Sequence, residues 1–419
     1  MNRRRRRPNY FGWVVFGLVV MFGYYFNRVY LPASPLLAGP TATPTRSFES
    51  FVTEAEDLFN KGKLLQSIEA YKSAINASPQ DPALYVALAR AQVWAGEYEA
   101  AQANAENALL LNSNNALAHG VRAWALDFQE GKNGTAMEAI AEALKFDDRN
   151  PVLQAYYVEI LVDSGFDNYT KAAEQSRIAL ALDQNIVETH RARGYILYVT
   201  QNYEESIQEY KEALKINPNL AMLHMELGQN YRALSARDEA IQEFTVANTL
   251  NASDPEPDYW ISRTYATFGE FSKALQYADT AVSDSPGDAS LRGNLGVMYY
   301  RNLFWAEAVQ ELGLAIFGGT TEEGVEIEGI PLANSPRIAE FYFTFGLALA
   351  RTNRCGEALQ MGQELQSKVP TDEIAMDAVN KIIEICQENL DNPPVDTPTL
   401  SAVEATPTPS ETETPIPTP

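Results

Sequence analysis

Residues 221–254 read AMLHMELGQNYRALSARDEAIQEFTVANTLNASD, and residues 289–322 read ASLRGNLGVMYYRNLFWAEAVQELGLAIFGGTTE. Aligned without a gap, the two 34-residue stretches carry apolar or small residues at the same offsets. The first has Leu227, Gly228, Tyr231, Ala240, Phe244 and Ala247, and the second has Leu295, Gly296, Tyr299, Ala308, Leu312 and Ala315. The helical period within each stretch predicts two helices that form a hairpin. Small residues at the eighth, twentieth and twenty-seventh positions let these helices approach closely.

Weaker copies of the pattern lie on both sides of residues 221–254. One holds Gly194, Leu197, Ser206, Tyr210, Ala213 and Pro218, and the other holds Tyr265, Gly269, Ala274, Ala278, Ala281 and Pro286. The proline near the end of each copy stops its second helix. A single hairpin cannot bury its apolar face, so these copies are expected to stack into a solenoid.

These residues resemble the W-x₂-L-G-x₂-Y…A-x₃-F…A…P pattern of the tetratricopeptide repeat (TPR) family. In that register the repeats begin near Glu49, Pro82, Ala116, Pro151, Val187, Ala221, Pro255, Ala289 and Ala339. The resemblance implies an all-α fold, a right-handed α-solenoid of about nine TPR helical hairpins. The amphipathic segment from Glu373 to Gln387 follows them without a partner hairpin and is expected to cap the array.

The N-terminal segment has the composition of a membrane anchor. Residues 1–9 include five consecutive arginines, Arg3 to Arg7, and residues 10–31 are apolar apart from Asn27 and Arg28, with aromatic side chains near both ends. We expect 10–31 to form a transmembrane helix with a cytoplasmic N-terminus and extracytoplasmic repeats, as in a membrane-anchored bacterial TPR protein. A secretory signal peptide has the same charge order, so a secreted protein after signal cleavage is the alternative.

Composition shifts divide the rest of the chain. Residues 32–47 form a Pro/Thr-rich linker, and residues 48–388 form the predicted solenoid. Residues 389–419 are rich in Pro, Thr and acidic side chains, and they are expected to form a disordered tail because they hold too few large apolar residues to fold. The predicted solenoid contains an insertion, residues 323–338, in which Val325, Ile327 and Ile330 alternate with acids. This insertion is either a loop closed over the edge of the solenoid or a partner-binding hook.

The sequence gives no sign of catalysis. It has no Gly-rich phosphate loop, no G-x-S-x-G, no H-E-x-x-H and no paired-cysteine motif. His119, His190 and His224 all fall at the fourth position of their repeats, where a packing role is expected rather than a metal site. We therefore expect a non-enzyme without cofactor, metal or small-molecule substrate. The balance of 55 acidic against 32 basic residues, with a net charge of -23, disfavours nucleic acid as a partner.

The TPR resemblance implies that the first helix of each hairpin lines a concave groove. Its exposed positions are the second, fifth, ninth, twelfth and thirteenth, where the candidate peptide-binding residues fall. These candidates are Arg90, Trp94, Arg191, Tyr195, Tyr198, Arg232, Tyr259, Arg263, Tyr300, Arg301, Phe343 and Arg351. Arginine beside aromatic rings suits carboxylates and extended peptides, so we expect the C-terminal half of the groove to bind an acidic or C-terminal peptide. Acids such as Glu159, Glu188 and Glu340 share this face, and pairing between neighbouring repeats is the alternative.

The expected function is that of a protein–protein interaction scaffold whose groove binds protein or peptide partners. A regulatory or specificity subunit of a membrane enzyme complex and a cell-wall carbohydrate binder are the two alternatives.

The chain has two cysteines, Cys355 in the last repeat and Cys386 in the predicted capping segment. If the cap folds back on that repeat, an oxidising compartment would join the two cysteines in a disulfide. Two buried free thiols are the alternative.

Overall fold

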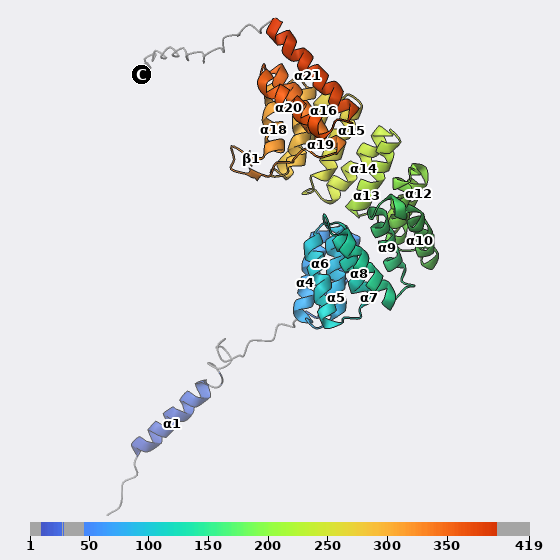
Figure 1. Ribbon diagram of the computed structural model, residues 1–419. Coiled ribbons are helices and arrows are strands. Elements are labelled where there is room, and N and C mark those ends of the chain that lie inside the picture. Colours follow the sequence, from blue (N-terminus) through green and yellow to red (C-terminus); the bar gives the residue numbers. More distant parts are fainter. Residues whose placement is uncertain (1–9, 27, 29–45, 392–419) are drawn as a thin grey trace, which may run out of the picture. The chain divides into compact units, whose positions relative to one another are not determined.

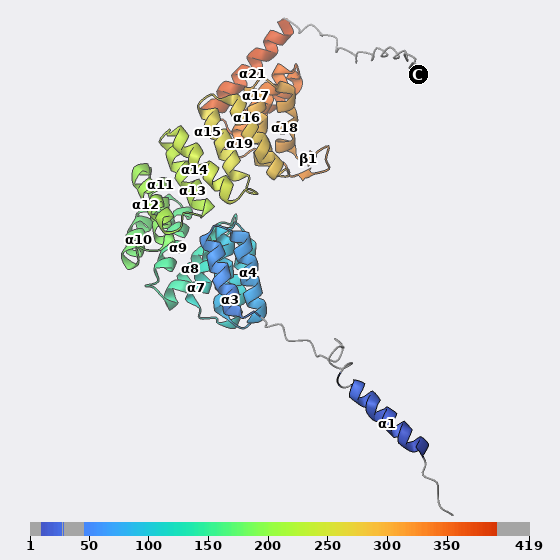
Figure 2. The same ribbon diagram turned by 180° about the vertical axis from the view of Figure 1, so that it is seen from behind.

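The computed structural model describes residues 10–26, 28 and 46–391, which contain twenty α-helices. Residues 1–9 and 392–419, and most of the predicted linker, lie outside the described residues. The chain divides into two compact units, Met1–Gln129 and Glu130–Pro419. Figures 1 and 2 show the helices of each unit from opposite sides.

Within the first unit, helices pack in pairs along the chain. Its helices are α1 (Tyr10–Tyr25), α3 (Phe48–Asn60), α4 (Leu64–Ala77), α5 (Pro82–Trp94), α6 (Tyr98–Leu111) and α7 (Ala116–Asp127). Helices α3 and α4 form one hairpin, α5 and α6 form the next, and α7 packs on α6. Ala55, Ile68, Tyr71 and Leu88 are buried between the first three of the repeat helices.

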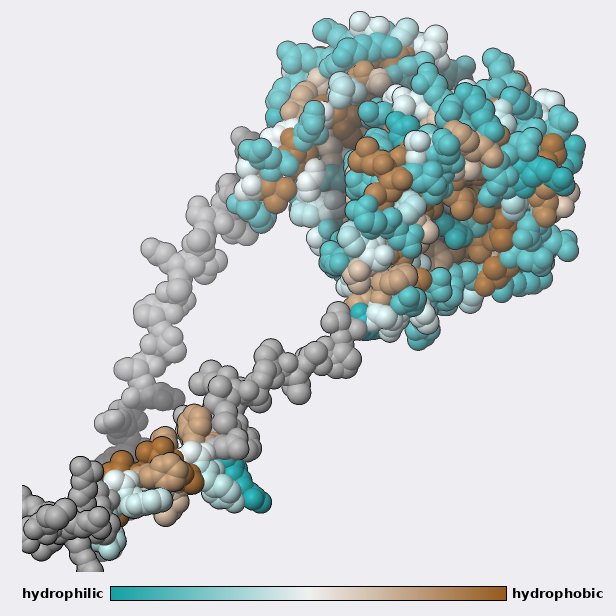
Figure 3. All heavy atoms as spheres, turned by 90° about the horizontal axis from the view of Figure 1, so that it is seen from below, coloured by the Kyte–Doolittle hydropathy of each residue, from teal (hydrophilic) through white to brown (hydrophobic). Residues whose placement is uncertain are grey.

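Helix α1 is shorter than the predicted span of residues 10–31. Its 16 residues give a length of about 24 Å, against a hydrocarbon core of roughly 30 Å. In the described part of the chain, no helix combines the length and apolar character needed to cross a membrane. The expected transmembrane helix is therefore not confirmed. Figure 3 shows that the apolar side chains of α1 are exposed, whereas polar residues cover much of the visible repeat surface.

The second unit continues the pattern of hairpins. It contains α8 (Asn133–Phe146), α9 (Pro151–Asp163), the short 3₁₀ helix η2 (Phe166–Asn168), α10 (Tyr169–Leu182), α11 (Val187–Val199), α12 (Tyr203–Ile216), α13 (Ala221–Ala233), α14 (Arg237–Leu250), α15 (Glu256–Thr267), α16 (Phe271–Asp284), α17 (Ala289–Arg301), α18 (Trp305–Phe317), α19 (Pro336–Arg351), α20 (Cys355–Lys368) and α21 (Glu373–Asp391). The first helix of each repeat starts within one residue of the predicted position, except α19, which starts three residues early.

Local chemistry explains several of these helix starts. Asp81, Asn150 and Asp288 each precede a first helix, and their side chains accept hydrogen bonds from backbone N–H groups in its first turn. Pro82 and Pro151 then occupy the first helical position, where the missing N–H costs nothing. The chain therefore marks the start of a repeat with an acceptor side chain and often with a proline.

The eighth position of a repeat is where the two helices of a hairpin come closest. A Cβ atom placed on Gly228 would lie 2.6 Å from Phe244 Cε1, and one on Gly296 would lie 2.6 Å from Leu312 Cγ. At such distances a side chain at either glycine would have to displace its neighbour. The small residues that the repeat pattern contains are therefore required for helix packing.

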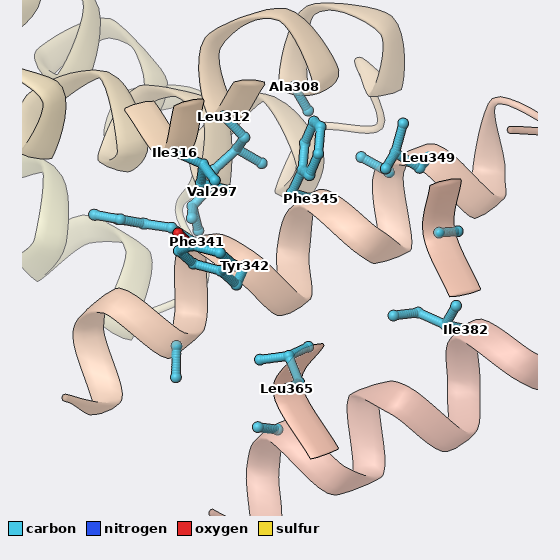
Figure 4. Close-up of a cluster of buried hydrophobic side chains, with 14 of the residues drawn as sticks. Val297, Ala308, Leu312, Ile316, Phe341, Tyr342, Phe345, Leu349, Leu365 and Ile382 are labelled. Carbon is cyan, nitrogen blue, oxygen red and sulfur yellow. The ribbon is translucent and has the colours of Figure 1, made fainter. Parts of the chain in front are cut away.

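The largest apolar cluster of the second unit lies at its C-terminal end. Phe341, Tyr342 and Phe345 of α19 are buried there against side chains of α17 and α18. Figure 4 shows these side chains together with Leu365 of α20 and Ile382 of α21. The final repeat and its cap thus share one core.

The insertion folds back onto its own repeats. Strands β1 (Gly319–Thr320) and β2 (Glu326–Ile327) pair antiparallel, and Ile327 is buried. The backbone N–H of Ile330 donates to the carbonyl oxygen of Ala315 at 2.9 Å, and the hydroxyl of Tyr342 donates to the carbonyl oxygen of Ile330 at 2.9 Å. The insertion therefore agrees with the expectation of a closed loop, and its last residues, from Pro336 onward, belong to α19.

The predicted disulfide is present. It joins Cys355, the first residue of α20, to Cys386 near the end of α21, with a Cα–Cα distance of 5.6 Å. The apolar side of α21, including Val379, Ile382 and Ile385, is buried in the same cluster. The capping helix is therefore held by both covalent and apolar contacts.

Candidate functional site

Most of the first helices of the second unit pack on the next first helix along the chain. Helix α9 packs on α11, α11 on α13, α15 on α17 and α17 on α19, while each second helix packs on the first helix that follows it. We call the surface of α9, α11, α13, α15, α17 and α19 the inner surface. It carries the candidate residues of the second unit.

Three arginines and one carboxylate meet on the inner surface and form what we call the arginine site: Arg232, Arg263, Arg337 and Glu340. Arg263 Nη1 donates to Glu340 Oε2 at 2.9 Å, and Arg337 Nη1 donates to the same oxygen at 2.5 Å. Burial alone raises the pKa of Glu340, but the two guanidinium groups outweigh it and hold that pKa below its ordinary value. Glu340 is thus ionised and shared by two cations.

Arg232 is the third cation of the arginine site. Its guanidinium lies over the ring of Trp260, 4.7 Å from the centroid, and its buried Nε has no hydrogen-bond partner. Among the described residues, no carboxylate lies within ion-pair distance of Arg232. Burial and the nearby charge of Arg263 lower the pKa of Arg232, while the hydroxyls of Tyr198 and Tyr259 act in the opposite direction. Within the described part of the chain, Arg232 is thus a half-buried cation without a carboxylate partner.

Neighbouring side chains fix Arg337 in place. Its Nη2 donates to Asn294 Oδ1 at 2.7 Å, and Asn294 Nδ2 donates in turn to Ser262 Oγ at 3.1 Å. The guanidinium also lies over the rings of Phe341 and Tyr259 at 4.6 and 5.6 Å. Its position is therefore set by two neighbouring helices, α15 and α17, and by Phe341 of its own helix α19.

Sequence reasoning missed Arg337, because it assigned residues 323–338 to a loop. The signal that could have placed it in a helix is the pair Ser335-Pro336, since serine before proline is typical of a helix start.

Arg191 does not face a ligand as predicted. Its side chain is 5% exposed and forms ion pairs with Glu159 at 2.5 Å and with Glu226 at 2.6 Å. Burial lowers the pKa of Arg191, but the two carboxylates outweigh this effect and raise it well above its ordinary value. Here the alternative of pairing between neighbouring repeats holds, because α9, α11 and α13 bring both acids to one guanidinium.

The other candidates of the second unit differ in their surroundings. Tyr195 donates to Asp163 Oδ1 at 2.5 Å, and burial together with that carboxylate raises the pKa of its hydroxyl. Tyr259 contacts the arginine site, and Tyr300 and Phe343 pack partly buried against the C-terminal core. Arg301 and Arg351 are exposed beside Phe271 and Trp305 at 5.9 and 5.8 Å.

Arg90 and Trp94 belong to the first unit. Trp94 is buried, contrary to its predicted exposure, and its ring meets that of Trp124 edge-on at 5.4 Å. Arg90 is half-buried near Tyr71, whose pKa is raised to about 12 mainly by burial. Trp94 therefore serves packing within the first unit.

Each of the three histidines forms a hydrogen bond with the turn that precedes its repeat. His119, His190 and His224 place Nε2 within hydrogen-bond distance of a backbone carbonyl oxygen six residues earlier, at 2.9, 2.8 and 3.0 Å. Gln154 and Arg292 donate to carbonyl oxygens at the same offset. The described residues contain no group of three His, Cys, Asp or Glu side chains that could hold a metal ion.

A pocket of about 1010 Å³ lies between the β1–β2 hairpin and α16 to α18. Its two arginines are already paired, Arg292 with Glu311 at 2.8 Å and Arg354 with Glu357 at 2.5 Å. The arginine site, in contrast, keeps an arginine without an acceptor, and it is the better candidate for ligand binding.

Two family models match the chain. A model described as "Tetratricopeptide repeat" matches residues 58–125, and one described as "TPR repeat" matches residues 194–235. No curated protein matches the sequence.

Solved structures share the fold at low sequence identity. The chain in "Crystal structure of APC/C hetero-tetramer Cut9-Hcn1" is 12% identical with a TM-score of 0.61, over 81% of this chain and 65% of that one. The present chain thus spans less than the full length of that protein. "Human IFIT1 dimer with m7Gppp-AAAA" is 13% identical with a TM-score of 0.56, over 83% and 90% of the two chains. "Human IFIT1 dimer with PPP-AAAA" is 15% identical with a TM-score of 0.54, over 81% and 83%.

At these identities the structural likeness shows the fold alone. The family models add the repeat type, and proteins built from such repeats typically mediate protein–protein interactions. The chain therefore carries tetratricopeptide repeats, which build an all-α solenoid.

Proposed function

We propose that the chain is a non-catalytic interaction scaffold that binds an acidic segment of a partner protein on its inner surface. The observation that carries this proposal is Arg232, a half-buried guanidinium over Trp260 without a carboxylate partner. A half-buried cation without a carboxylate partner is costly for the free protein, and an acidic ligand would supply the acceptor that its Nε lacks.

Aromatic rings beside the cations favour an extended peptide. Tyr198 and Tyr259 both lie close enough to Arg232 to affect its pKa, and Trp260 stacks beneath its guanidinium. Planar guanidinium groups held against rings keep their N–H donors pointed in fixed directions, which suits bidentate recognition of carboxylates. The aromatic surface alone would also suit a sugar, but a neutral carbohydrate would leave the arginines without an acceptor.

The proposal also includes the compartment. The disulfide between Cys355 and Cys386 supports an oxidising environment, and the arginine run before α1 supports export with the N-terminus in the cytoplasm. We place the repeats outside the cytoplasm, with residues 10–31 holding them to the membrane. Alkaline carbonate extraction of the full-length chain should leave it in the membrane pellet; release into the supernatant would contradict anchoring.

Cross-linking in intact cells, followed by affinity capture and mass spectrometry, tests the binding function. The double variant Arg232→Glu/Arg263→Glu should lose the captured partner, because two attractive charges become repulsive. Arg177→Glu is the control for charge reversal, since Arg177 is exposed on the second helix α10, and each single variant, Arg232→Glu or Arg263→Glu, matches its change in charge. Capture by the double variant at the level of the control would reject the proposal.

A further inference from the structure

Glu340 occupies part of the arginine site from within the chain. One of its oxygens, Oε2, accepts hydrogen bonds from both Arg263 and Arg337, at 2.9 and 2.5 Å. Its side chain is 19% exposed, so the contact can be reached from solvent. A carboxylate in this position has the same chemistry as the acidic group of a ligand.

The charges of the site are not balanced by Glu340. Counted over the described residues, three guanidinium groups and one carboxylate give the site a net charge of +2. Arg263 and Glu340 are the charged groups that affect the pKa of Arg337. Arg263 and Arg337 are the charged groups that affect the pKa of Glu340. Arg232 faces Arg263 and two tyrosine hydroxyls. Glu226, the nearest acid on α13, is committed to Arg191 at 2.6 Å.

The donors of the site are held in place before any ligand binds. Asn294 and the rings of Phe341 and Tyr259 fix Arg337, and the ring of Trp260 fixes Arg232. Two buried donor atoms, Arg232 Nε and Arg337 Nε, have no hydrogen-bond partner. Because little side-chain entropy remains to be lost, a matching anion gains affinity from this preorganisation.

We propose that the arginine site binds a dianionic group of a peptide, and that this group displaces Glu340 from Arg263 and Arg337. The dianion is either a phosphoryl group or two adjacent acidic side chains, which present the same charge and several acceptor oxygens. Glu340 then acts as an internal competitor that prevents weak monoanions from occupying the site. This inference rests on the proposed binding function and specifies the group that the inner surface recognises.

Isothermal titration calorimetry of the full-length chain tests this inference with three peptides of one Gly/Ser-rich sequence. One carries a phosphoserine, one carries Asp-Asp at that point, and one carries Asn-Asn. We expect at least one of the dianionic peptides to bind and the Asn-Asn peptide not to bind. The Glu340→Gln variant should bind the dianionic peptide with a Kd roughly threefold to tenfold lower than that of the wild type. The comparison of phosphoserine with Asp-Asp identifies which source of the dianion is used.

Three results would overturn the inference: no binding of either dianionic peptide to wild type and Glu340→Gln, equal binding of the Asn-Asn peptide, or a Kd that rises or stays unchanged in Glu340→Gln. Arg232→Gln is the second variant, because it removes the charge without adding an acid, and it should weaken binding where Arg177→Gln does not. The proposed function has a separate test: it is rejected if the Arg232→Glu/Arg263→Glu variant captures the partner as well as the control does.

Discussion

Arg263 of α15 and Glu340 of α19 form an ion pair at 2.9 Å although 77 residues separate them in the chain. Helix α17 packs between their two helices, so the contact spans two repeats instead of linking neighbours. The early start of α19 adds Arg337 to the same oxygen of Glu340. The arginine site is therefore a product of the insertion before the last repeat as much as of the repeats themselves.

Removing Arg191 should destabilise the second unit strongly. Arg191→Met leaves the buried carboxylate of Glu159 and the partly buried carboxylate of Glu226 without this cation, which costs roughly 3–5 kcal/mol. Urea unfolding followed by circular dichroism measures the loss. Arg177→Met, at an exposed position of α10, should change the free energy of unfolding by less than about 0.5 kcal/mol. Equal stability of the two variants would show that the Arg191 ion pairs contribute nothing.

A single methyl group at Gly228 should also destabilise the fold. The new Cβ of Gly228→Ala would lie 2.6 Å from Phe244 Cε1, and overpacking of this kind costs about 1–3 kcal/mol. Gly356→Ala is the control, because nothing lies within 4 Å of its Cβ and its backbone is helical. The control should be neutral or slightly stabilising, and thermal unfolding distinguishes the two outcomes. A neutral Gly228→Ala would contradict close helix contact at the eighth position.

Leu303 offers the opposite test, a substitution that should stabilise. It lies in the turn between α17 and α18 with a φ of 67°, a left-handed conformation that costs an ordinary side chain about 1–2 kcal/mol. Because Leu303 is 70% exposed, Leu303→Gly removes this strain and little packing. After the greater chain entropy of glycine is subtracted, a gain of roughly 0.5–1 kcal/mol remains. Gly269→Ala, at the equivalent turn with a φ of 77°, should lose stability; the same sign of change for both variants would refute the argument.

His190 should make the stability of the second unit depend on pH. Both its ring nitrogens face acceptors, Glu209 Oε2 at 2.7 Å and the carbonyl oxygen of Gln184 at 2.8 Å. Burial lowers the pKa of His190, but these hydrogen bonds, with the charge of Glu212 nearby, raise it above its ordinary value of 6.5. The stabilisation contributed by protonated His190 is thus fully present below pH 6.5, and it is lost as the pH rises through the pKa of His190 in the folded state.

The pKa of Glu209 shifts in the opposite direction. Burial raises it, but hydrogen bonds from His190 and Arg193 hold it below its ordinary value of 4.5, so its contribution is lost as the pH falls below that value. His190→Gln should therefore cost more stability at pH 5.5 than at pH 8.5. Gln154→Ala removes the equivalent uncharged hydrogen bond, and its cost should be the same at both pH values. Denaturant unfolding at the two pH values decides, and a pH-independent cost for His190→Gln would contradict the assignment.

Removing the disulfide should loosen the cap. The bond closes a loop with a sequence separation of 31 residues, for which the chain-entropy model gives roughly 3–4 kcal/mol. Cys355→Ser/Cys386→Ser should therefore lower the melting temperature and speed hydrogen exchange in α21 more than in α13. Reductant should shift the wild type in the same way and leave the double variant unchanged. Unaltered exchange in α21 would show that apolar packing alone holds the cap.

The sequence predicts the repeats well because their signal is local and repeated. Close contacts at Gly228 and Gly296, and acceptors before α5 and α17, follow directly from residue types at fixed offsets. The turns are less predictable, since Leu303 occupies a left-handed position where a glycine stands in other repeats. Stacking of the helices supplies the energy that overrides this local preference.

The candidate site was predictable only in part. The register identified Arg232, Arg263 and Tyr259, but it also predicted exposure for Arg191 and Trp94, which are buried. Exposure depends on which neighbouring helix supplies an acid or a ring, and a single repeat does not contain that information. Arg337 was missed because an insertion interrupts the period just before it.

Binding of an acidic partner segment at the arginine site is best tested by hydrogen exchange of the full-length chain, with and without the cross-linked partner. Binding should slow exchange in α13, α15 and α19, which carry Arg232, Arg263 and Arg337. Slower exchange confined to the second helices α14, α16 and α18, with α13, α15 and α19 unchanged, would contradict it.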